Sequence, residues 1–196
     1  MSDEARPGTA PPPALHLLAA PPPLPPGRPA AVLATLWPPP TGDGEWRLLF
    51  IERSRGPGAH AGQFAFPGGA MEAGDADAAA CALREAHEEI GLRGDWVRLL
   101  GYLAPVPIVV SGFAVQPVVA AVTADVTPAD LRPAAAEVSR IFLRSRAELA
   151  AAARWERRPP HSPRTGAWPV FGLPEGRLWG ATAVMVKQLL RRWPRS

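Results

Sequence analysis

Residues 68–92 read GGAMEAGDADAAACALREAHEEIGL, and this stretch predicts a helix that begins near Asp77 and ends at Gly91. Asp77 can accept hydrogen bonds from the first turn, and Gly91 can end the helix in the left-handed conformation that glycine tolerates. Between them apolar residues recur every three or four positions, the spacing of one buried face, at Ala79, Leu83, Ala86 and Ile90. We therefore expect a central amphipathic helix.

Three glutamates stand on the polar side of this helix. Glu85, Glu88 and Glu89 occupy positions i, i+3 and i+4, so their carboxylates share one face. The charges of Glu85 and Glu89 repel each other at this spacing, which lowers helix stability unless a cation lies between them. Hard divalent ions such as Mg²⁺ take oxygen ligands and often share them with substrate phosphates. The pattern predicts a metal site on this face.

Two further features frame the glutamates. Arg84 lies four residues before Glu88, a spacing at which it can pair with that carboxylate and orient it. Upstream, residues 64–69 read FAFPGG, which predicts a short strand running into a loop that glycines close tightly. The predicted order is strand, glycine loop, acidic loop and carboxylate helix.

This order resembles the Nudix box, in which Gly, five residues, Glu and seven residues precede Arg-Glu-apolar-x-Glu-Glu-x-Gly-apolar. Gly69 matches the first Gly, and the end of the box is matched by Arg84, Glu85, Ala86, Glu88, Glu89, Gly91 and Leu92. Two departures are visible, because Asp75 stands where the first Glu belongs and eight residues separate it from Arg84. The extra residue falls in the loop before the helix, and Glu72 or Asp77 is an alternative to Asp75.

The flanking sequence is similar to the coenzyme A pyrophosphatase branch of the Nudix hydrolases. That branch carries Leu-Leu before Arg-Ser and then His-x-Gly-Gln-x-Ala-Phe-Pro-Gly-Gly, which LLFIERS at 48–54 and HAGQFAFPGG at 60–69 resemble. The segment LWGATA at 178–183 resembles its Trp-Gly-x-Thr-Ala, so the resemblance covers about residues 30–193. The branch also has an Arg between Arg-Ser and the His, where this chain has RGPGA at 55–59. If that Arg binds a substrate phosphate, Arg55 must substitute for it from a different place, or affinity is lost.

The resemblance implies metal-dependent hydrolysis of coenzyme A or its derivatives to 3′,5′-ADP and 4′-phosphopantetheine. It implies that Mg²⁺ or Mn²⁺ is held by the Gly69 carbonyl and the carboxylates of Glu85, Glu88 and Glu89. Family members take the catalytic base either from the box, here Glu88 or Glu89, or from a distant loop. For the distant base our candidate is Glu137, ahead of Asp125, Asp130 and Glu148.

Three basic residues are candidates for binding substrate phosphates. Arg53 lies on a strand that leads into the site, where it can bind phosphate or pair with a box carboxylate, and Arg55 follows it. His60 precedes the glycine loop and can contact phosphate or stabilise a turn. His87 is expected to point away from the metal face and to be exposed. Trp179 is expected to pack in the core or a dimer contact instead of stacking on adenine.

Composition limits the remaining possibilities. A chain of 196 residues predicts one domain, and a hydrophobic content of 47% suffices for a core, while no apolar run approaches a membrane span. The single cysteine, Cys81, is expected to be a packing residue and excludes an internal disulfide, as is typical of a reducing cytoplasm. The net charge of +3 does not indicate a nucleic-acid partner. We expect a cytoplasmic monomer or homodimer with a small-molecule nucleotide substrate of the coenzyme A class.

The chain divides into a proline-rich, flexible segment at 1–28, too broken by proline for a signal peptide, and a Nudix domain at 29–196. Residues 15–18 can still dock one short element on the domain. Strands are predicted at 30–37, 46–52, 98–103, 115–122, 137–142 and 168–171, helices at 146–154 and 181–193, and a loop at 155–167. Mixed strands with one catalytic and one C-terminal helix predict the α/β class and a Nudix-type α/β/α sandwich with a mixed sheet.

Two other interpretations remain. One is the same chemistry on ADP-ribose, a dinucleotide or a nucleoside triphosphate, which the altered segment at 55–59 favours. The other is a non-catalytic nucleotide-binding regulator, a class that usually loses one or more box glutamates. Products separate the enzymes, because coenzyme A gives 3′,5′-ADP whereas the other substrates give AMP or inorganic pyrophosphate.

Overall fold

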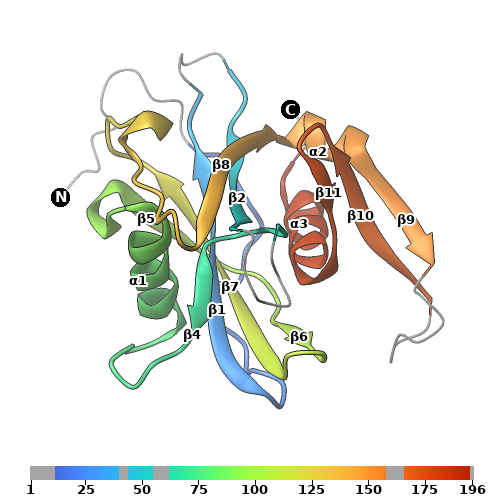
Figure 1. Ribbon diagram of the computed structural model, residues 1–196, viewed down its shortest axis with the longest axis horizontal. Coiled ribbons are helices and arrows are strands. Elements are labelled where there is room, and N and C mark those ends of the chain that lie inside the picture. Colours follow the sequence, from blue (N-terminus) through green and yellow to red (C-terminus); the bar gives the residue numbers. More distant parts are fainter. Residues whose placement is uncertain (1–11, 40–43, 55–61, 158–165, 195–196) are drawn as a thin grey trace.

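The computed structural model describes residues 12–39, 44–54, 62–157 and 166–194 (Figure 1). Its helices are α1 (Ala78–Ile90), α2 (Arg146–Ala152) and α3 (Gly180–Arg192), with 3₁₀ turns at Gly94–Trp96 and Pro128–Asp130. Its strands are β1 (Arg28–Trp37), β2 (Arg47–Arg53), β3 (Phe64–Ala65), β4 (Gly68–Ala70), β5 (Val97–Tyr102), β6 (Val106–Ile108), β7 (Phe113–Val122), β8 (Val138–Ser145), β9 (Ala153–Arg157), β10 (Ala167–Leu173) and β11 (Gly176–Leu178).

The strands form one large mixed sheet and one small sheet. The large sheet has the order β3-β2-β1-β7-β5, and β4, β6 and β8 pair with β1, β7 and β2. Strands β1 and β7 run parallel, from Arg28 opposite Phe113 to Leu36 opposite Ala121, whereas the other pairs are antiparallel. The mixed sheet that the sequence predicts is confirmed.

The large sheet lies between two helices, with a hydrophobic core on each face (Figure 1). On one face α1 contributes Ala82, Ala86 and Ile90, which pack with Leu33 and Leu49. On the other face α3 contributes Ala183, Met185, Val186 and Leu189. Strand residues that alternate between the two faces supply both cores, as the period of a β-strand requires. The predicted α/β/α sandwich is therefore present.

Helix α1 begins and ends where the local signals predict. Asp77 accepts a hydrogen bond from the Ala80 N–H at 2.8 Å, and Gly91 takes the left-handed conformation with a φ of 68°. The small buried side chains of Ala82 and Ala86 let the helix approach β1 and β4 closely. The helix is therefore fixed both along its axis and in its rotation, which determines where its glutamates point.

The small antiparallel sheet β11-β10-β9 is the main departure from the predicted elements. Helix α2 ends at Ala152 instead of residue 154, and Ala153–Arg157 form β9 where a loop was expected from residue 155. Strand β9 pairs with β10 from Ala167 opposite Arg157 to Phe171 opposite Ala153. Such a short strand depends on its neighbour more than on its own propensity, so its sequence carries little local signal.

The described part of the proline-rich segment docks on the edge of the large sheet. Leu18 forms an isolated antiparallel bridge with Tyr102 of β5, with hydrogen bonds of 3.0 and 2.9 Å in the two directions. Leu15 and Leu17 pack against the core on the α3 side. The docking expected for residues 15–18 is confirmed. Within the described ranges, none of the helices has the length and apolar character needed to cross a bilayer.

Candidate active site

The glycine loop and α1 meet through Glu89. This carboxylate is almost fully buried, and its Oε2 accepts a hydrogen bond from the Gly68 N–H at 3.0 Å. Its Oε1 lies 3.4 Å from Nη1 of Arg53, at the end of β2. Arg53 also donates to the Gly68 carbonyl at 3.1 Å. Of the two uses predicted for Arg53, the structure therefore contains the pairing with a box carboxylate.

Arg84 is the centre of the exposed half of the cluster. Its Nε and Nη2 donate to the two oxygens of Asp75, each at 3.0 Å, while Nη1 donates to Glu85 and Glu88, also at 3.0 Å. The predicted pairing of Arg84 with Glu88 is confirmed. A guanidinium thus supplies the positive charge that the crowded carboxylates require.

These contacts distinguish Asp75 from the alternatives Glu72 and Asp77. Asp75 holds Arg84 with both oxygens, whereas Asp77 caps α1 and the Glu72 carboxylate lies 4.0 Å from Arg84 with 70% of its side chain exposed. Hydrogen bonds from Arg84, aided by the Glu72 N–H, lower the pKa of Asp75 to about 2. The extra residue in the box therefore leaves the Asp75–Arg84 contact intact.

Glu85 lies directly against Gly69. A Cβ added to Gly69 would be 2.4 Å from Glu85 Oε1, so any side chain there would displace the carboxylate. The Gly69 carbonyl faces α1, where Cys81 Sγ lies 3.8 Å away. The backbone of Gly69 thus lies beside the Glu85 carboxylate, and its carbonyl faces the same helix.

Glu137, the predicted distant base, also lies near this cluster. Burial raises the pKa of Glu89 to about 7, the Arg53 charge and the Gly68 N–H oppose the rise, and the charges of Glu85 and Glu137 add to it. Burial likewise raises the pKa of Glu85, opposed by Arg84 and supported by Glu88 and Glu137. The structure thus brings Glu137, which is solvent-exposed, within electrostatic reach of two box carboxylates.

The other acids considered for the base have structural contacts elsewhere. Asp130 accepts hydrogen bonds from the Thr127 N–H and hydroxyl in a capping box, and Glu148 accepts one from the Ser145 N–H at the start of α2. Asp125 is exposed in the turn after β7. These positions leave Glu137 as the described candidate beside the helix.

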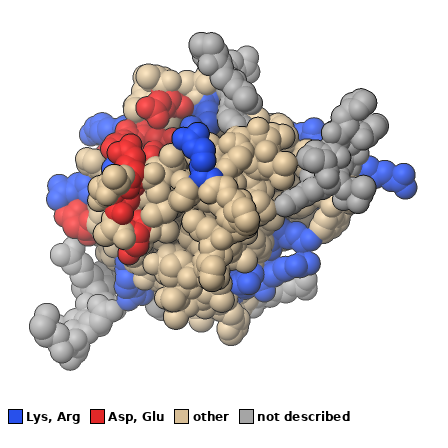
Figure 2. Space-filling view, turned by 90° about the horizontal axis from the view of Figure 1, so that it is seen from below, with Lys and Arg blue, Asp and Glu red and all other residues tan. Residues whose placement is uncertain are grey.

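The acidic side chains gather on the side of the molecule that α1 occupies, interspersed with basic groups (Figure 2). His87 is exposed, as predicted. Cys81 is fully buried, and burial raises the pKa of its thiol to about 11, which fits the expected packing role. Arg55 and His60 lie outside the described residues, so their proposed contacts with phosphate remain predictions.

The donor set is suited to a hard divalent ion. Three carboxylates and a nearby backbone carbonyl are oxygen ligands of the kind that Mg²⁺ and Mn²⁺ prefer. Among the described residues, however, no group of three or more His, Cys, Asp or Glu side chains is already closed around one point. Arg84 and Arg53 contact the carboxylate oxygens instead. The chemistry of the residues fits a metal, provided that these carboxylates turn toward it.

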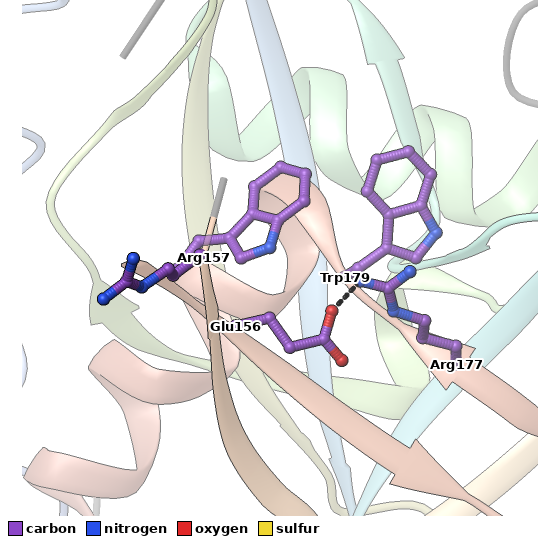
Figure 3. Close-up of a pocket in the computed structure, with 5 residues that line it drawn as sticks. Glu156, Arg157, Arg177 and Trp179 are labelled. Atoms are coloured by element: carbon purple, nitrogen blue, oxygen red, sulfur yellow. Dashed lines mark hydrogen bonds and ion pairs between the residues drawn. The ribbon is translucent and has the colours of Figure 1, made fainter. Parts of the chain in front are cut away.

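Trp179 lies in a setting that the sequence did not indicate. It is half-buried and lines a pocket of about 430 Å³ on the small sheet, together with Trp168, Glu156, Arg157 and Arg177. Its ring centroid is 5.7 Å from that of Trp168, and Glu156 forms an ion pair with Arg177 (Figure 3). Trp179 therefore packs on a neighbouring indole at the surface. It is only half-buried, so it is not the core residue that was one of the two expectations.

Sequence reasoning missed two contributors to the site. Gly68 donates its N–H to Glu89, and Ser54 binds the loop that carries Glu137 through two hydrogen bonds. The sequence signal for Ser54 is the Arg-Ser pair at the end of β2, which belongs to the family resemblance and does not reveal the contacts of the hydroxyl. Contacts made by a backbone N–H or by a hydroxyl across 81 residues leave no periodic pattern in the sequence.

Loss of the Asp75 carboxylate should make stability depend differently on pH. Since the pKa of Asp75 in the folded protein lies at about 2, below its ordinary value of 3.8, the ion pair with Arg84 contributes fully above about pH 4. The contribution is lost as the pH falls through about 2. Asp75→Asn should therefore be less stable than the parent at pH 7, with a difference that shrinks between pH 4 and pH 2. Urea unfolding at several pH values measures this difference in stability. A difference that does not change with pH would contradict a stabilising ion pair between Asp75 and Arg84.

Comparison with known proteins places this arrangement in a family. Residues 28–165 match the NUDIX domain family. The Nudix hydrolase NudL of Enterobacter sp. (strain 638), named as uncharacterized, is 36% identical over 148 residues, 72% of each chain. NudL of Escherichia coli (strain K12) is 45% identical over 97 residues, which are 48% of this chain and 47% of that protein.

A solved structure supports the fold. The crystal structure of a MutT/nudix family protein from Enterococcus faecalis superposes with a TM-score of 0.53 at 15% identity, covering 87% of this chain and 63% of the other. Nudix hydrolases generally use divalent metal ions, in agreement with the oxygen-rich donor set. The matched family, the relatives and the carboxylate helix agree, and the chain therefore belongs to the Nudix family as a pyrophosphohydrolase.

Proposed function

We propose that the enzyme hydrolyses the pyrophosphate bond of coenzyme A or its derivatives, giving 3′,5′-ADP and 4′-phosphopantetheine or its acyl form. The observation that supports the site is the face of α1, where Glu85, Glu88 and Glu89 lie with Glu137 nearby. The substrate class is supported by the sequence on either side of the box, LLFIERS and HAGQFAFPGG.

The metal would be Mg²⁺ or Mn²⁺, held by the carboxylates of Glu85, Glu88 and Glu89 and by the Gly69 carbonyl. Such an ion supplies neutralisation of the pyrophosphate charge and a lower pKa for a bound water. Arg84 links Asp75 to Glu85 and Glu88, so it orients two of the proposed ligands. Glu89 is almost fully buried beside the glycine loop and Glu88 is exposed, which supports a ligand set that extends from the loop to solvent.

Glu137 is the proposed general base. Its carboxylate would accept the proton of the attacking water, a role that requires proximity to the reacting centre and access to solvent. The Ala134 N–H donates to the Glu89 carbonyl at 2.9 Å and the Glu137 N–H to the Ala134 carbonyl at 2.8 Å, contacts that support the first requirement, and the exposure of Glu137 supports the second. Glu88 and Glu89 remain the alternatives that the family resemblance offers for this role.

Product analysis tests the substrate directly. Purified protein is incubated with coenzyme A and, separately, ADP-ribose, each with Mg²⁺ or Mn²⁺ and with EDTA as control. Metal-dependent 3′,5′-ADP and 4′-phosphopantetheine are expected. Cleavage of ADP-ribose with no turnover of coenzyme A would retain the hydrolase and overturn the substrate class.

Other nucleotide substrates are the second candidate, and segment 55–59 is the specific observation that favours them. The coenzyme A branch has an Arg before the His, and this chain has RGPGA there. If that Arg contributes affinity for a substrate phosphate, Arg55 has to supply it. Arg55→Ala should then raise KM for coenzyme A while leaving kcat nearly unchanged, since binding in the ground state and transition state is lost equally.

A further inference from the structure

Ser54, the residue that follows β2, holds two points of the segment that leads to Glu137. Its Oγ donates to the Ala135 carbonyl at 2.9 Å, and its backbone N–H donates to the Glu137 carbonyl at 2.8 Å. Two donors of one residue thus fix carbonyls that are two residues apart. Such a pair restricts both the position and the direction of the bound backbone.

The other end of the same segment is tied to α1. The Arg132 N–H donates to the Ile90 carbonyl at 2.8 Å, and the Ala134 N–H donates to the Glu89 carbonyl at 2.9 Å. The Glu137 N–H then closes a turn onto the Ala134 carbonyl at 2.8 Å. Residues 132–137 therefore bridge from the end of the carboxylate helix to the end of β2.

The neighbouring residue on β2 serves the other half of the site. Arg53 contacts Glu89 and the Gly68 carbonyl, as described above. Two consecutive residues at one strand end therefore contact different parts of the site: Arg53 contacts the helix and the glycine loop, whereas Ser54 contacts the loop that carries the proposed base. A shift of β2 would move both halves together.

We propose that Ser54 is a positioning residue for catalysis, whose hydroxyl holds Glu137 at its working distance from the box carboxylates. The inference rests on the proposed function, because it takes Glu137 as the base. Among the described contacts the Ser54 hydroxyl binds the Ala135 carbonyl, so its proposed effect on catalysis is transmitted through the backbone that leads to Glu137. Small misplacements of a catalytic group cost large factors in rate.

A double-mutant cycle tests the proposal. Ser54→Ala should lower kcat about tenfold, with KM within about twofold of the parent, because positioning matters in the transition state. In a Glu137→Gln background, Ser54→Ala should cause little further loss, since its target group is already absent. A loss of the same size in both backgrounds would show that Ser54 acts elsewhere and would overturn the proposal.

Ser139 provides a matched control on the adjacent strand. Its hydroxyl also donates to a backbone carbonyl, that of Glu52 at 3.1 Å, but it does not hold the loop at 132–137. Ser139→Ala should leave kcat within about twofold of the parent, and Ser54→Thr, which keeps the hydroxyl, should recover most of the activity. If Ser139→Ala lowered kcat as much as Ser54→Ala, the cause would be a general weakening of the β2–β8 pair, and the proposal would be overturned.

A second measurement needs no substrate. Amide hydrogen exchange at residues 134–138 should be faster in Ser54→Ala than in the parent, because one of the two hydrogen bonds from Ser54 is gone, while α1 should exchange as before. Unchanged exchange in this segment would overturn the positioning role. Full activity of Glu137→Gln would instead refute Glu137 as the base. If exchange in the loop still became faster in Ser54→Ala, the contact between Ser54 and the loop would stand, and only the proposed function of Glu137 would be wrong.

Discussion

Glu89→Gln should lower kcat by about 10³-fold or more, because it removes one charged ligand from the proposed metal site and with it several kcal/mol of transition-state stabilisation. The fold should survive the change. Gln is isosteric with Glu and keeps an oxygen for the Gly68 N–H, which donates to Glu89 at 3.0 Å. The substitution also removes a carboxylate whose burial raises its pKa to about 7. Steady-state kinetics and thermal unfolding together measure both parts.

Glu88→Gln is expected to lower kcat by a similar factor. Because Glu88 is exposed, this loss cannot be attributed to disturbance of a buried side chain. The control is Glu72→Gln. Glu72 is also acidic and lies 4.0 Å from Arg84, but 70% of its side chain is exposed and it is not among the proposed ligands. It should retain nearly full activity. If Glu88→Gln or Glu89→Gln kept full turnover with an unchanged metal requirement, that residue would have no part in the mechanism.

Gly68→Ala should destabilise the protein by about 3 kcal/mol or more, a loss typical of a side chain forced into occupied space with an unfavourable backbone conformation. A Cβ at Gly68 would lie 2.3 Å from the Ala31 carbonyl oxygen and 2.6 Å from Val32 Cα, and φ is +156°. Because the obstacles are backbone atoms of β1, they cannot move aside cheaply. Displacing Gly68 would also break its hydrogen bond to Glu89.

Urea unfolding measures this effect, and Gly74→Ala is the matched control. Gly74 lies in the acidic loop after β4, and a Cβ there would meet nothing within 4 Å. Its replacement should change stability by less than about 0.5 kcal/mol, as is usual for surface substitutions away from special features. Equal stability of the two variants would mean that β4 can shift relative to β1 without cost.

The carboxylate helix could be predicted because its signals are local. The cap at Asp77, the left-handed Gly91 and the apolar spacing all lie within 15 residues of one another, and each matches the structure. For Arg53 the sequence left two uses open, and the role of Ser54 could not be predicted in this way. The contacts of Ser54 depend on the pairing of β2 with β8, which brings residues 135–137 beside residue 54 across about 80 intervening positions. Sequence spacing contains no record of such pairings.

In the small sheet a local signal is present, but it predicts the wrong structure. Alanine-rich residues from 146 onward have strong helical propensity, so the helix was predicted to continue to residue 154. Pairing with β10 redirects the chain into a strand from Ala153. Tertiary contact thus overrides local preference where the helix is short and exposed on most of its surface.

The contacts of the amino-terminal segment limit how early this segment can fold during synthesis. Leu18 bonds to Tyr102, and the His16 N–H donates to the carbonyl of Arg192, near the opposite end of the described chain. Because synthesis runs from the amino to the carboxyl end, the hydrogen bond between His16 and Arg192 can form only after residue 192 has been made. Residues 15–18 are thus made before the parts of the chain that they contact, and during that interval Leu15 and Leu17 present apolar surface to chaperones.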